Sequence, residues 1–279
     1  MKKKKRRRSR LLPVLLVLAL IWGNRSIVCE EFSFASPALP EAFDGFRLAV
    51  LTDLHSASFG EDNWRLLDAV AARRPDAILL VGDLVDERTE DAVGYAASLG
   101  AQLAAIAPTY YVTGNHEWAH GTERAEAVKT ALRAAGVTVL TNEYRILTRG
   151  GDTIFLAGID DPNAYADQKT PEALARELES AKDDPFWLLL AHRNDRFAAQ
   201  YSRLGADLTL SGHGHGGCIR LPFTDGLLGT QHNFFPTHTA GFYCDNGAWL
   251  FVSRGLGNVG ATFRVFNRPQ AAFVTLKRG

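Results

Sequence analysis

Residues 77–86 read AILLVGDLVD, an apolar run followed by a glycine and two aspartates. The run Ala77–Val81 has the length of a strand buried on both faces, and Gly82 marks a turn directly after it. Four other apolar runs also end in glycine, aspartate, asparagine or histidine. They are Arg47–Thr52, Tyr110–Thr113, Phe186–Ala191 and Asp207–Leu210. This pattern predicts five buried strands whose ends carry polar side chains.

Longer segments with a helical period lie between these runs. They are rich in alanine with spaced charges, and they are Trp64–Arg73, Thr89–Ala107, Thr122–Ala135 and Pro171–Ala181. Shorter alternating runs predict additional antiparallel strands at Val137–Leu140, Tyr144–Thr148, Thr153–Ala157, Phe242–Cys244, Trp249–Val252 and Ala272–Leu276. Alternating strands and helices are typical of layered α/β proteins. We therefore expect an α/β fold, a sandwich of two mixed sheets flanked by helices.

The bulk composition predicts one globular domain with an acidic surface. The 279 residues are 46% apolar and 22% charged, and no linker-like or repeated segment interrupts residues 27–279. The formal net charge is zero, but eight of the 31 Lys and Arg residues lie in the first ten positions. The rest of the chain has 23 basic and 31 acidic residues, a balance of −8. Because phosphate-backbone binding needs clustered Lys and Arg, no nucleic-acid partner is expected.

The N-terminal segment has the order of an export signal. A basic tail precedes the twelve-residue apolar stretch Leu11–Trp22, which is short for a spanning helix of ~17–25 residues. No Ala-x-Ala site follows closely. We interpret residues 1–26 as a basic tail plus an uncleaved signal anchor in the cell membrane, with residues 27–279 on the extracytoplasmic side. Cleavage and secretion is the alternative.

The chain contains three cysteines, Cys29, Cys218 and Cys244, which cannot all pair with one another. A bridge between Cys218 and Cys244 in an oxidising compartment and isolated thiols both stay open. The cysteines lie outside the pattern of strand-end residues, so they are not predicted ligands.

The polar residues at the strand ends should meet at one edge of the sheets, where α/β proteins place their ligands. Their oxygen and imidazole donors suit divalent Mn, Zn or Fe. The set includes five of the eight histidines and consists of Asp53, His55, Asp83, Asn115, His116, His192, His213 and His215. Each residue alone has a structural explanation, such as a cap, a turn or a core histidine. Together they predict a metal site.

These residues occur in blocks that resemble the calcineurin-like metallophosphoesterase family. The blocks are Asp53–His55 (DLH), Gly82–Asp86 (GDLVD), Gly114–Glu117 (GNHE), His192 and Gly212–His215 (GHGH). The resemblance covers Leu39 to the C-terminus and implies a four-layer αββα sandwich. The flanks Leu39–Arg47 and Ser253–Asn258 further resemble the bacterial membrane-anchored, YkuE-like branch of the family.

The resemblance implies two divalent metal ions and a role for each matching residue. Asp53, His55 and His215 would hold the first ion, and Asp83 would bridge both. The second site would be completed by Asn115, His192 and His213. His116 is left as the candidate general acid for the leaving oxygen. Glu117 and Asp86 would orient neighbouring groups.

The implied reaction is hydrolysis of a phosphoester, with a phosphodiester favoured, by a hydroxide that the two metals activate. The predicted membrane anchor extends the substrate class to lipid-linked or envelope phosphoesters. Two alternatives stay open: a hydrolase resembling the pyrophosphatases that cleave UDP-sugar lipids, and a metal-binding scaffold of the same fold without catalysis.

Two features depart from the family pattern or extend it. Arg193 follows His192 in a loop where the family often has a proline, and Arg193 could contact substrate. The segment Ile219–Gly241 comes directly after the last histidine block and is placed to form a wall or lid, so Arg220 could also bind substrate. No sequence feature indicates an oligomeric state.

Overall fold

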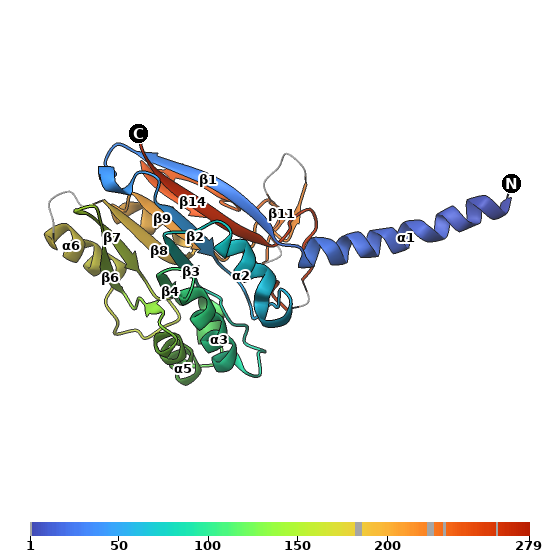
Figure 1. Cartoon of the computed structure of the whole chain (residues 1–279), viewed down its shortest axis with the longest axis horizontal. Coiled ribbons are helices and arrows are strands. Elements are labelled where there is room, and N and C mark those ends of the chain that lie inside the picture. Colours follow the sequence, from blue (N-terminus) through green and yellow to red (C-terminus); the bar gives the residue numbers. More distant parts are fainter. Residues whose placement is uncertain (1, 182–185, 222–225, 231–232, 261) are drawn as a thin grey trace.

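The protein is a sandwich of two mixed β-sheets with helices on both outer faces (Figure 1). The computed structural model describes residues 2–181, 186–221, 226–230, 233–260 and 262–279, with side chains from Pro13 onward. Helices α2, α3 and α5 pack on one sheet and α6 packs on the other. The predicted α/β fold with its four αββα layers is confirmed.

The first sheet has the strand order β1-β14-β2-β3-β4-β5. Strands β2 to β5 are parallel, whereas β14 runs antiparallel to β2. The strand bounds are β1 Val28–Ser36, β2 Arg47–Leu51, β3 Ala77–Val81, β4 Thr109–Val112, β5 Thr138–Val139 and β14 Gln270–Arg278. Strand β1 has no counterpart among the expected strands. It pairs in parallel with β14 along the edge of the sheet, so its position depends on a partner far along the chain.

The second sheet has the order β12-β13-β9-β8-β7-β6, with a parallel centre and an antiparallel strand at each edge. Its bounds are β6 Glu143–Arg149, β7 Asp152–Gly158, β8 Trp187–Arg193, β9 Leu208–Gly212, β12 Gly241–Asp245 and β13 Ala248–Val252. A small hairpin of β10, Ile219–Arg220, and β11, Gly226–Leu228, stands apart from both sheets.

The helices of the body largely follow the expected segments, and their bounds are α2 Trp64–Ala71, α3 Ala92–Ala104, α4 Asn115–Trp118, α5 Thr122–Ala134 and α6 Pro171–Ala181. Helix α3 begins three residues later than expected. Asp91 explains the shift, because its side chain accepts a hydrogen bond of 2.8 Å from Gly94 N and caps the helix there. Single 3₁₀ turns are present at Glu41–Phe43, Glu61–Asn63, Asn194–Arg196 and Tyr201–Arg203.

The main core lies between the two sheets. Val50 and Leu79 from the first sheet pack against Leu190 and Phe251 from the second. Because the central strands are covered by the other sheet on one face and by helices on the other, they are mostly apolar, as in AILLV of β3 and the first five residues, WLLLA, of β8. The parallel strands β2, β3, β4, β8 and β9 all end at the same edge of the sandwich, and the predicted ligand residues lie at or just after these ends.

Helix α1, Lys2–Arg25, projects from the body, and β1 begins three residues after it (Figure 1). Asn24 attaches the end of α1 to the body, since its Nδ2 donates to Arg264 O at 2.9 Å and its Oδ1 accepts from Arg264 N at 2.8 Å. Within the described part of the chain, no helix has both the length and the apolar content to cross a membrane.

Candidate metal centre

The structure brings the predicted ligand residues to one edge of the sandwich. Asp53 and His55 follow β2, Asp83 follows β3, and Asn115 and His116 begin α4 just after β4. His192 lies in β8, and His213 and His215 follow β9. Three groups have ligand atoms within 4.8 Å of one another, which are Asp53-His55-His215, His55-Asp83-His116 and Asp83-His192-His213.

Five of these residues have left-handed backbone conformations. The φ angles are 51° at Asp53, 46° at His55, 50° at Asp83, 67° at His213 and 48° at His215. Such φ values are unfavourable for residues other than glycine, at about 1–3 kcal/mol each, and they persist where the surroundings enforce them. The strand ends therefore turn sharply to direct these side chains toward the centre of the site.

The glycines of the sequence blocks allow this close approach. A Cβ atom on Gly114 would lie 2.3 Å from Asp83 Oδ1, and one on Gly212 would lie 2.3 Å from Asp53 Oδ2. A Cβ atom on Gly82 would lie 2.5 Å from the His192 ring. Any larger residue at these positions would displace a predicted ligand.

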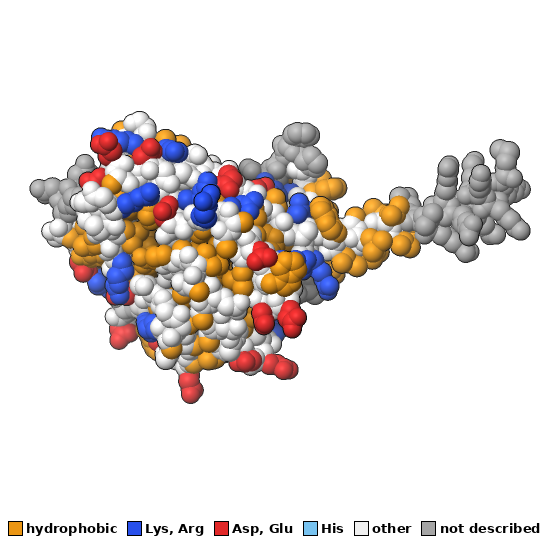
Figure 2. Space-filling model, viewed as in Figure 1, with side chains coloured by type: hydrophobic (Ala, Val, Ile, Leu, Met, Phe, Trp, Pro, Cys, Tyr) orange, Lys and Arg blue, Asp and Glu red, His pale blue; other side chains and the backbone are white. Residues whose placement is uncertain are grey.

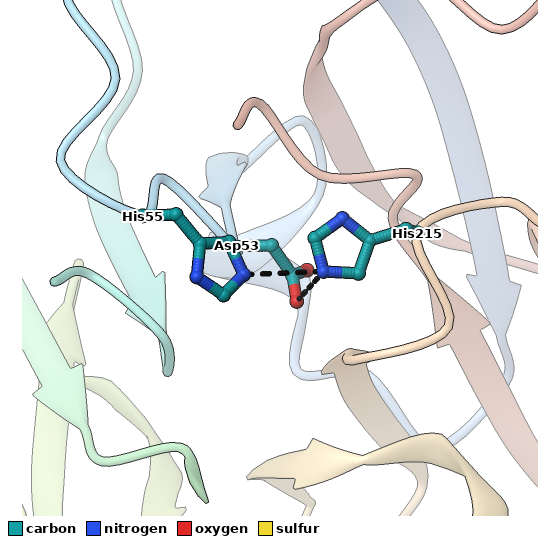
Figure 3. A group of neighbouring side chains, drawn as sticks. All are labelled: Asp53, His55 and His215. Carbon is teal, nitrogen blue, oxygen red and sulfur yellow. Dashed lines mark hydrogen bonds and ion pairs between the residues drawn. The ribbon is translucent and has the colours of Figure 1, made fainter. Parts of the chain in front are cut away.

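Asp53, His55 and His215 form a buried group whose donor atoms face one another (Figure 3). His55 Nε2 lies 3.1 Å from His215 Nε2, which lies 3.3 Å from Asp53 Oδ1. Ligands about 2.0–2.2 Å from a tetrahedral metal ion are themselves separated by about 3.3–3.6 Å, and the separations here lie near the lower end of that range. The separations in this group therefore fit a bound cation.

Asp83, His192 and His213 form a second buried or half-buried group. His192 Nε2 is 3.1 Å from Asp83 Oδ2, and the His192 ring is fixed by a contact of 2.9 Å between its Nδ1 and Val81 O. Asn115 Oδ1 and His213 Nε2 are buried and have no hydrogen-bond partner within the described part of the chain. Unpartnered buried polar atoms are rare and require an explanation. A metal ion held by these oxygen and nitrogen atoms supplies one.

Asp83 lies between the two groups, since its Oδ2 is also 3.7 Å from His55 Nε2. Burial opposes ionisation of Asp83, but the neighbouring imidazoles, led by His192, outweigh it and hold the carboxyl pKa well below its usual range. The same contact acts on His192. Burial alone would lower its pKa, but the charge and hydrogen bond of Asp83 raise it to about 10. The carboxylates thus attract positive charge, which suits a cation.

His116 lies at the side of the centre, with its side chain 12% exposed. Its backbone N donates to Asp83 Oδ1 at 2.9 Å, and its ring is perpendicular to that of His55 at 4.6 Å. His116 Nδ1 lies 3.0 Å from Glu87 Oε2, an ion-pair contact without hydrogen-bond geometry. Sequence reasoning missed Glu87, although it directly follows the GDLVD block.

Two acidic residues support the loops of the centre. The buried Glu117 carboxylate accepts backbone hydrogen bonds from Gly114 at 2.6 Å and from Leu84 at 2.7 Å, and so joins two blocks that are far apart in sequence. Burial, together with the charge on Asp83, raises the pKa of Glu117 to about 7. Asp86 Oδ2 lies 3.6 Å from His55 Nδ1, behind the ring.

One further residue that supports the centre had no signal in the sequence. Arg264 is buried and places Nη2 3.2 Å from His215 Nδ1, while the same nitrogen donates to Gly257 O at 2.6 Å. Burial lowers the pKa of His215 to about 3, and His55 and Arg264 add to this effect. His215 is therefore neutral, which is the form that binds metals. No motif contains Arg264, so only the fold could have identified it.

The two arginines predicted to contact substrate both bond to protein groups. Arg193 Nε donates to Asp161 Oδ2 at 2.6 Å, and Arg220 Nη1 donates to Gly216 O at 2.7 Å. Substrate contact by either residue stays a prediction. Within the expected lid segment, residues 222–225 and 231–232 lie outside the described part of the chain. The three cysteines have free thiols, with Cys218 buried and Cys244 exposed.

Comparisons with known proteins agree with this geometry. Residues 46–217 match the model of the calcineurin-like phosphoesterase family. The metallophosphoesterase YkuE of Bacillus subtilis is 28% identical over 259 residues, covering 90% of this chain and 86% of YkuE. The phosphodiesterase YaeI of Escherichia coli is 30% identical over 239 residues, covering 83% and 82% of the two chains.

The fold comparison points the same way. The NAD nucleotidase NadN of Haemophilus influenzae has a similar fold with a TM-score of 0.53 at 17% identity, covering 75% of this chain and 44% of NadN. Since the family model matches most of the chain and includes every strand-end block, the protein belongs to the calcineurin-like phosphoesterase family and is a metallophosphoesterase.

Proposed function

We propose that this protein hydrolyses phosphodiesters with two divalent metal ions, either Mn, Zn or Fe. Asp53, His55 and His215 would hold one ion, Asn115, His192 and His213 would hold the second, and Asp83 would be shared between the two sites. The observation that carries the proposal is the set of buried donor atoms that face one another at 3.1 to 3.3 Å. When bound, the metals lower the pKa of water and stabilise charge on the phosphoryl oxygens.

His116 donates the proton that the leaving oxygen requires. Its Nδ1 lies 3.0 Å from Glu87 Oε2, and that contact orients the ring. Since Nδ1 faces Glu87, Nε2 is the ring nitrogen that would donate to the leaving oxygen. Glu87 therefore acts as a positioning residue for His116 and does not itself touch the substrate.

A cleft beside the metal centre supports a diester substrate. The cleft has a volume of about 580 Å³, and among the described residues its lining includes His55, Arg25 and Arg65 but no acidic residue. A phosphodiester carries one negative charge and has two organic groups, so it needs space and positive charge next to the metals. The name of the E. coli relative, a phosphodiesterase, is consistent with this preference.

Helix α1 is the proposed tether of the enzyme to the cell membrane. Its basic residues precede its apolar residues, an order that leaves the tail in the cytoplasm and residues 27–279 on the extracytoplasmic side. Phosphoesters of the cell envelope, including lipid-linked ones, are the substrates that an enzyme in this position meets.

The test is metal analysis of the purified protein, together with rates on bis-p-nitrophenyl phosphate and p-nitrophenyl phosphate in Mn²⁺, Zn²⁺ or Fe²⁺. We expect two bound metal ions and faster hydrolysis of the diester. Asp83→Asn should lose metal and lower the diester rate roughly 10³-fold. Asp68→Asn, on the exposed face of α2, is the control and should match the wild type. Bound metal without hydrolysis would instead indicate a binding scaffold.

A further inference from the structure

Four phenylalanines near the β10–β11 hairpin extend into solvent. Phe234, Phe235, Phe263 and Phe266 are 71%, 73%, 70% and 73% exposed, the highest values among large apolar residues whose side chains the structure describes. Single exposed apolar residues are common on proteins, but adjoining large ones mark interaction surfaces. Nothing in the proposed reaction uses these rings.

The two pairs of phenylalanines belong to one surface. Val265, between Phe263 and Phe266, pairs with Ile219 of β10, and Phe234 pairs with Leu228 of β11. Since β10 pairs with β11, both phenylalanine segments flank the same hairpin. Phe266 also lines an apolar cleft of about 770 Å³ with Leu16, Leu20 and Trp22 of α1. The surface therefore continues from the hairpin onto the helix.

Helix α1 is apolar on all its faces next to this surface. The five consecutive residues Val14–Leu18 are between 53% and 59% exposed, so no side of this turn packs against the described part of the body. In Figure 2, hydrophobic side chains line this part of the helix. A protein partner usually covers one stripe of a helix, whereas lipid surrounds all of it. Because Val14–Leu18 are evenly exposed, lipid is favoured over a protein partner as the surroundings of this part of α1.

Arginines lie at the edge of the apolar surface. Arg268 stacks over the Trp22 ring at 4.5 Å, and Arg25 ends α1 and lines the cleft that contains His55. Aromatic rings with adjacent basic residues are characteristic of the interface between lipid tails and anionic headgroups.

We propose that Val14–Trp22 of α1 and the four phenylalanines form one bilayer-binding surface for membranes with anionic headgroups. We further infer that the substrate is a phosphodiester carried by a lipid of that bilayer, an inference that rests on the proposed function. Asn24 and Arg25, at the end of the immersed helix, line the cleft with the metal ligand His55. Immersion of the surface would hold this cleft at the level of the headgroups.

The experiment uses the full chain and two probes with the same scissile bond. Methyl p-nitrophenyl phosphate is soluble, whereas hexadecyl p-nitrophenyl phosphate is placed in vesicles of equimolar phosphatidylcholine and phosphatidylglycerol. For the double variant Phe263→Ser with Phe266→Ser we expect weaker flotation with the vesicles and about tenfold slower hydrolysis of the hexadecyl probe. The rate on the methyl probe should not change, which also shows that the variant is folded.

Two further variants keep the test decisive. Ile146→Ser, at a residue 55% exposed on edge strand β6, is the matched control and should behave as wild type on both probes. Phe263→Trp with Phe266→Trp should retain vesicle binding. Unchanged flotation and an unchanged hexadecyl rate in the serine variant would overturn the proposal, as would loss of a dimer without any change in vesicle binding. If wild type leaves the methyl probe intact, the proposed function fails, but flotation still tests the surface.

Discussion

The metal centre and the apolar surface around α1 differ in how many contacts hold their side chains in place. The loop that contains Arg264 contributes residues to both. In the metal centre, side chains such as Asp83 and His192 are buried and have several partners each. On the apolar surface, Phe263 and Phe266 are exposed and project from the loop whose Arg264 reaches His215. The difference suggests that a rigid part performs the chemistry, while a part with few contacts selects where the chemistry occurs.

The largest effect should come from the proposed proton donor for the leaving oxygen. His116→Gln removes this imidazole but leaves the predicted ligands in place. We expect kcat for bis-p-nitrophenyl phosphate to fall about 10²–10⁴-fold, with metal content unchanged by elemental analysis. Parallel loss of metal would instead make His116 a ligand, consistent with its position within 4.8 Å of the donor atoms of His55 and Asp83.

The next largest effect is expected on the free energy of unfolding, when a buried ion pair behind the metal centre is broken. Lys129 Nζ donates to Asp160 Oδ2 at 3.0 Å, and Asp160 Oδ1 accepts from Thr113, which precedes the GNHE block. Lys129→Met leaves Asp160 buried and unpaired, so the free energy of unfolding in urea should fall by about 3–5 kcal/mol. Adding Asp160→Asn should recover most of this loss.

The sign of the pH dependence also tests this pair. Burial raises the pKa of Asp160 even though Lys129 opposes the shift, so removal of Lys129 should raise it further. An acid with a raised folded pKa binds a proton more readily in the folded state than in the unfolded state. The stability lost by Lys129→Met should therefore shrink as the pH falls through the folded pKa of Asp160. A deficit that is independent of pH would contradict this account.

A smaller effect is expected from crowding the centre without changing a ligand. Gly114 has a φ of −109°, which alanine tolerates, so the effect of Gly114→Ala is steric, with its Cβ 2.3 Å from Asp83 Oδ1. We expect metal affinity to fall about 10–100-fold in a metal titration. The matched control is Gly23→Ala, where no described atom lies within 4 Å of the added Cβ apart from chain neighbours and the nearby backbone of α1. Equal affinities in the two variants would mean that the centre is less rigid than its packing indicates.

The same contrast explains what the sequence could predict. The apolar strands and the polar residues after them were predictable, because parallel strands buried on both faces must be apolar and must end at a common edge. The tight turns after β2, β3 and β9 require particular residues at particular spacings. The blocks from Asp53 to His215 therefore predicted a fold and a set of residues that the structure brings together.

Features that depend on distant partners were not predictable in this way. Arg264 lies in a loop without a motif, and its contact with His215 exists only because β14 returns that loop to the site. Strand β1 likewise depends on pairing with β14. Phe263 and Phe266 alone look like ordinary core residues. Their exposure is a property of the folded surface. Sequence patterns therefore predicted the residues of the metal centre better than they predicted the apolar surface beside it.

The smallest effect should come from the link between the two regions. Asn24→Ala removes the bonds from α1 to Arg264 N and O and to Asn258, each worth about 1 kcal/mol. Arg264 keeps its bonds to Gly257 O and Arg254 O, so the rate on soluble methyl p-nitrophenyl phosphate should stay within about twofold of wild type. Hydrolysis of the vesicle-borne hexadecyl probe should fall further, because α1 no longer fixes the cleft relative to the bilayer.

The matched control is Asn163→Ala, at an exposed position away from α1. Equal losses of hydrolysis rate on the two probes would mean that α1 and the metal centre act as one unit. The contrast between a rigid catalytic part and a separate positioning part would then be wrong.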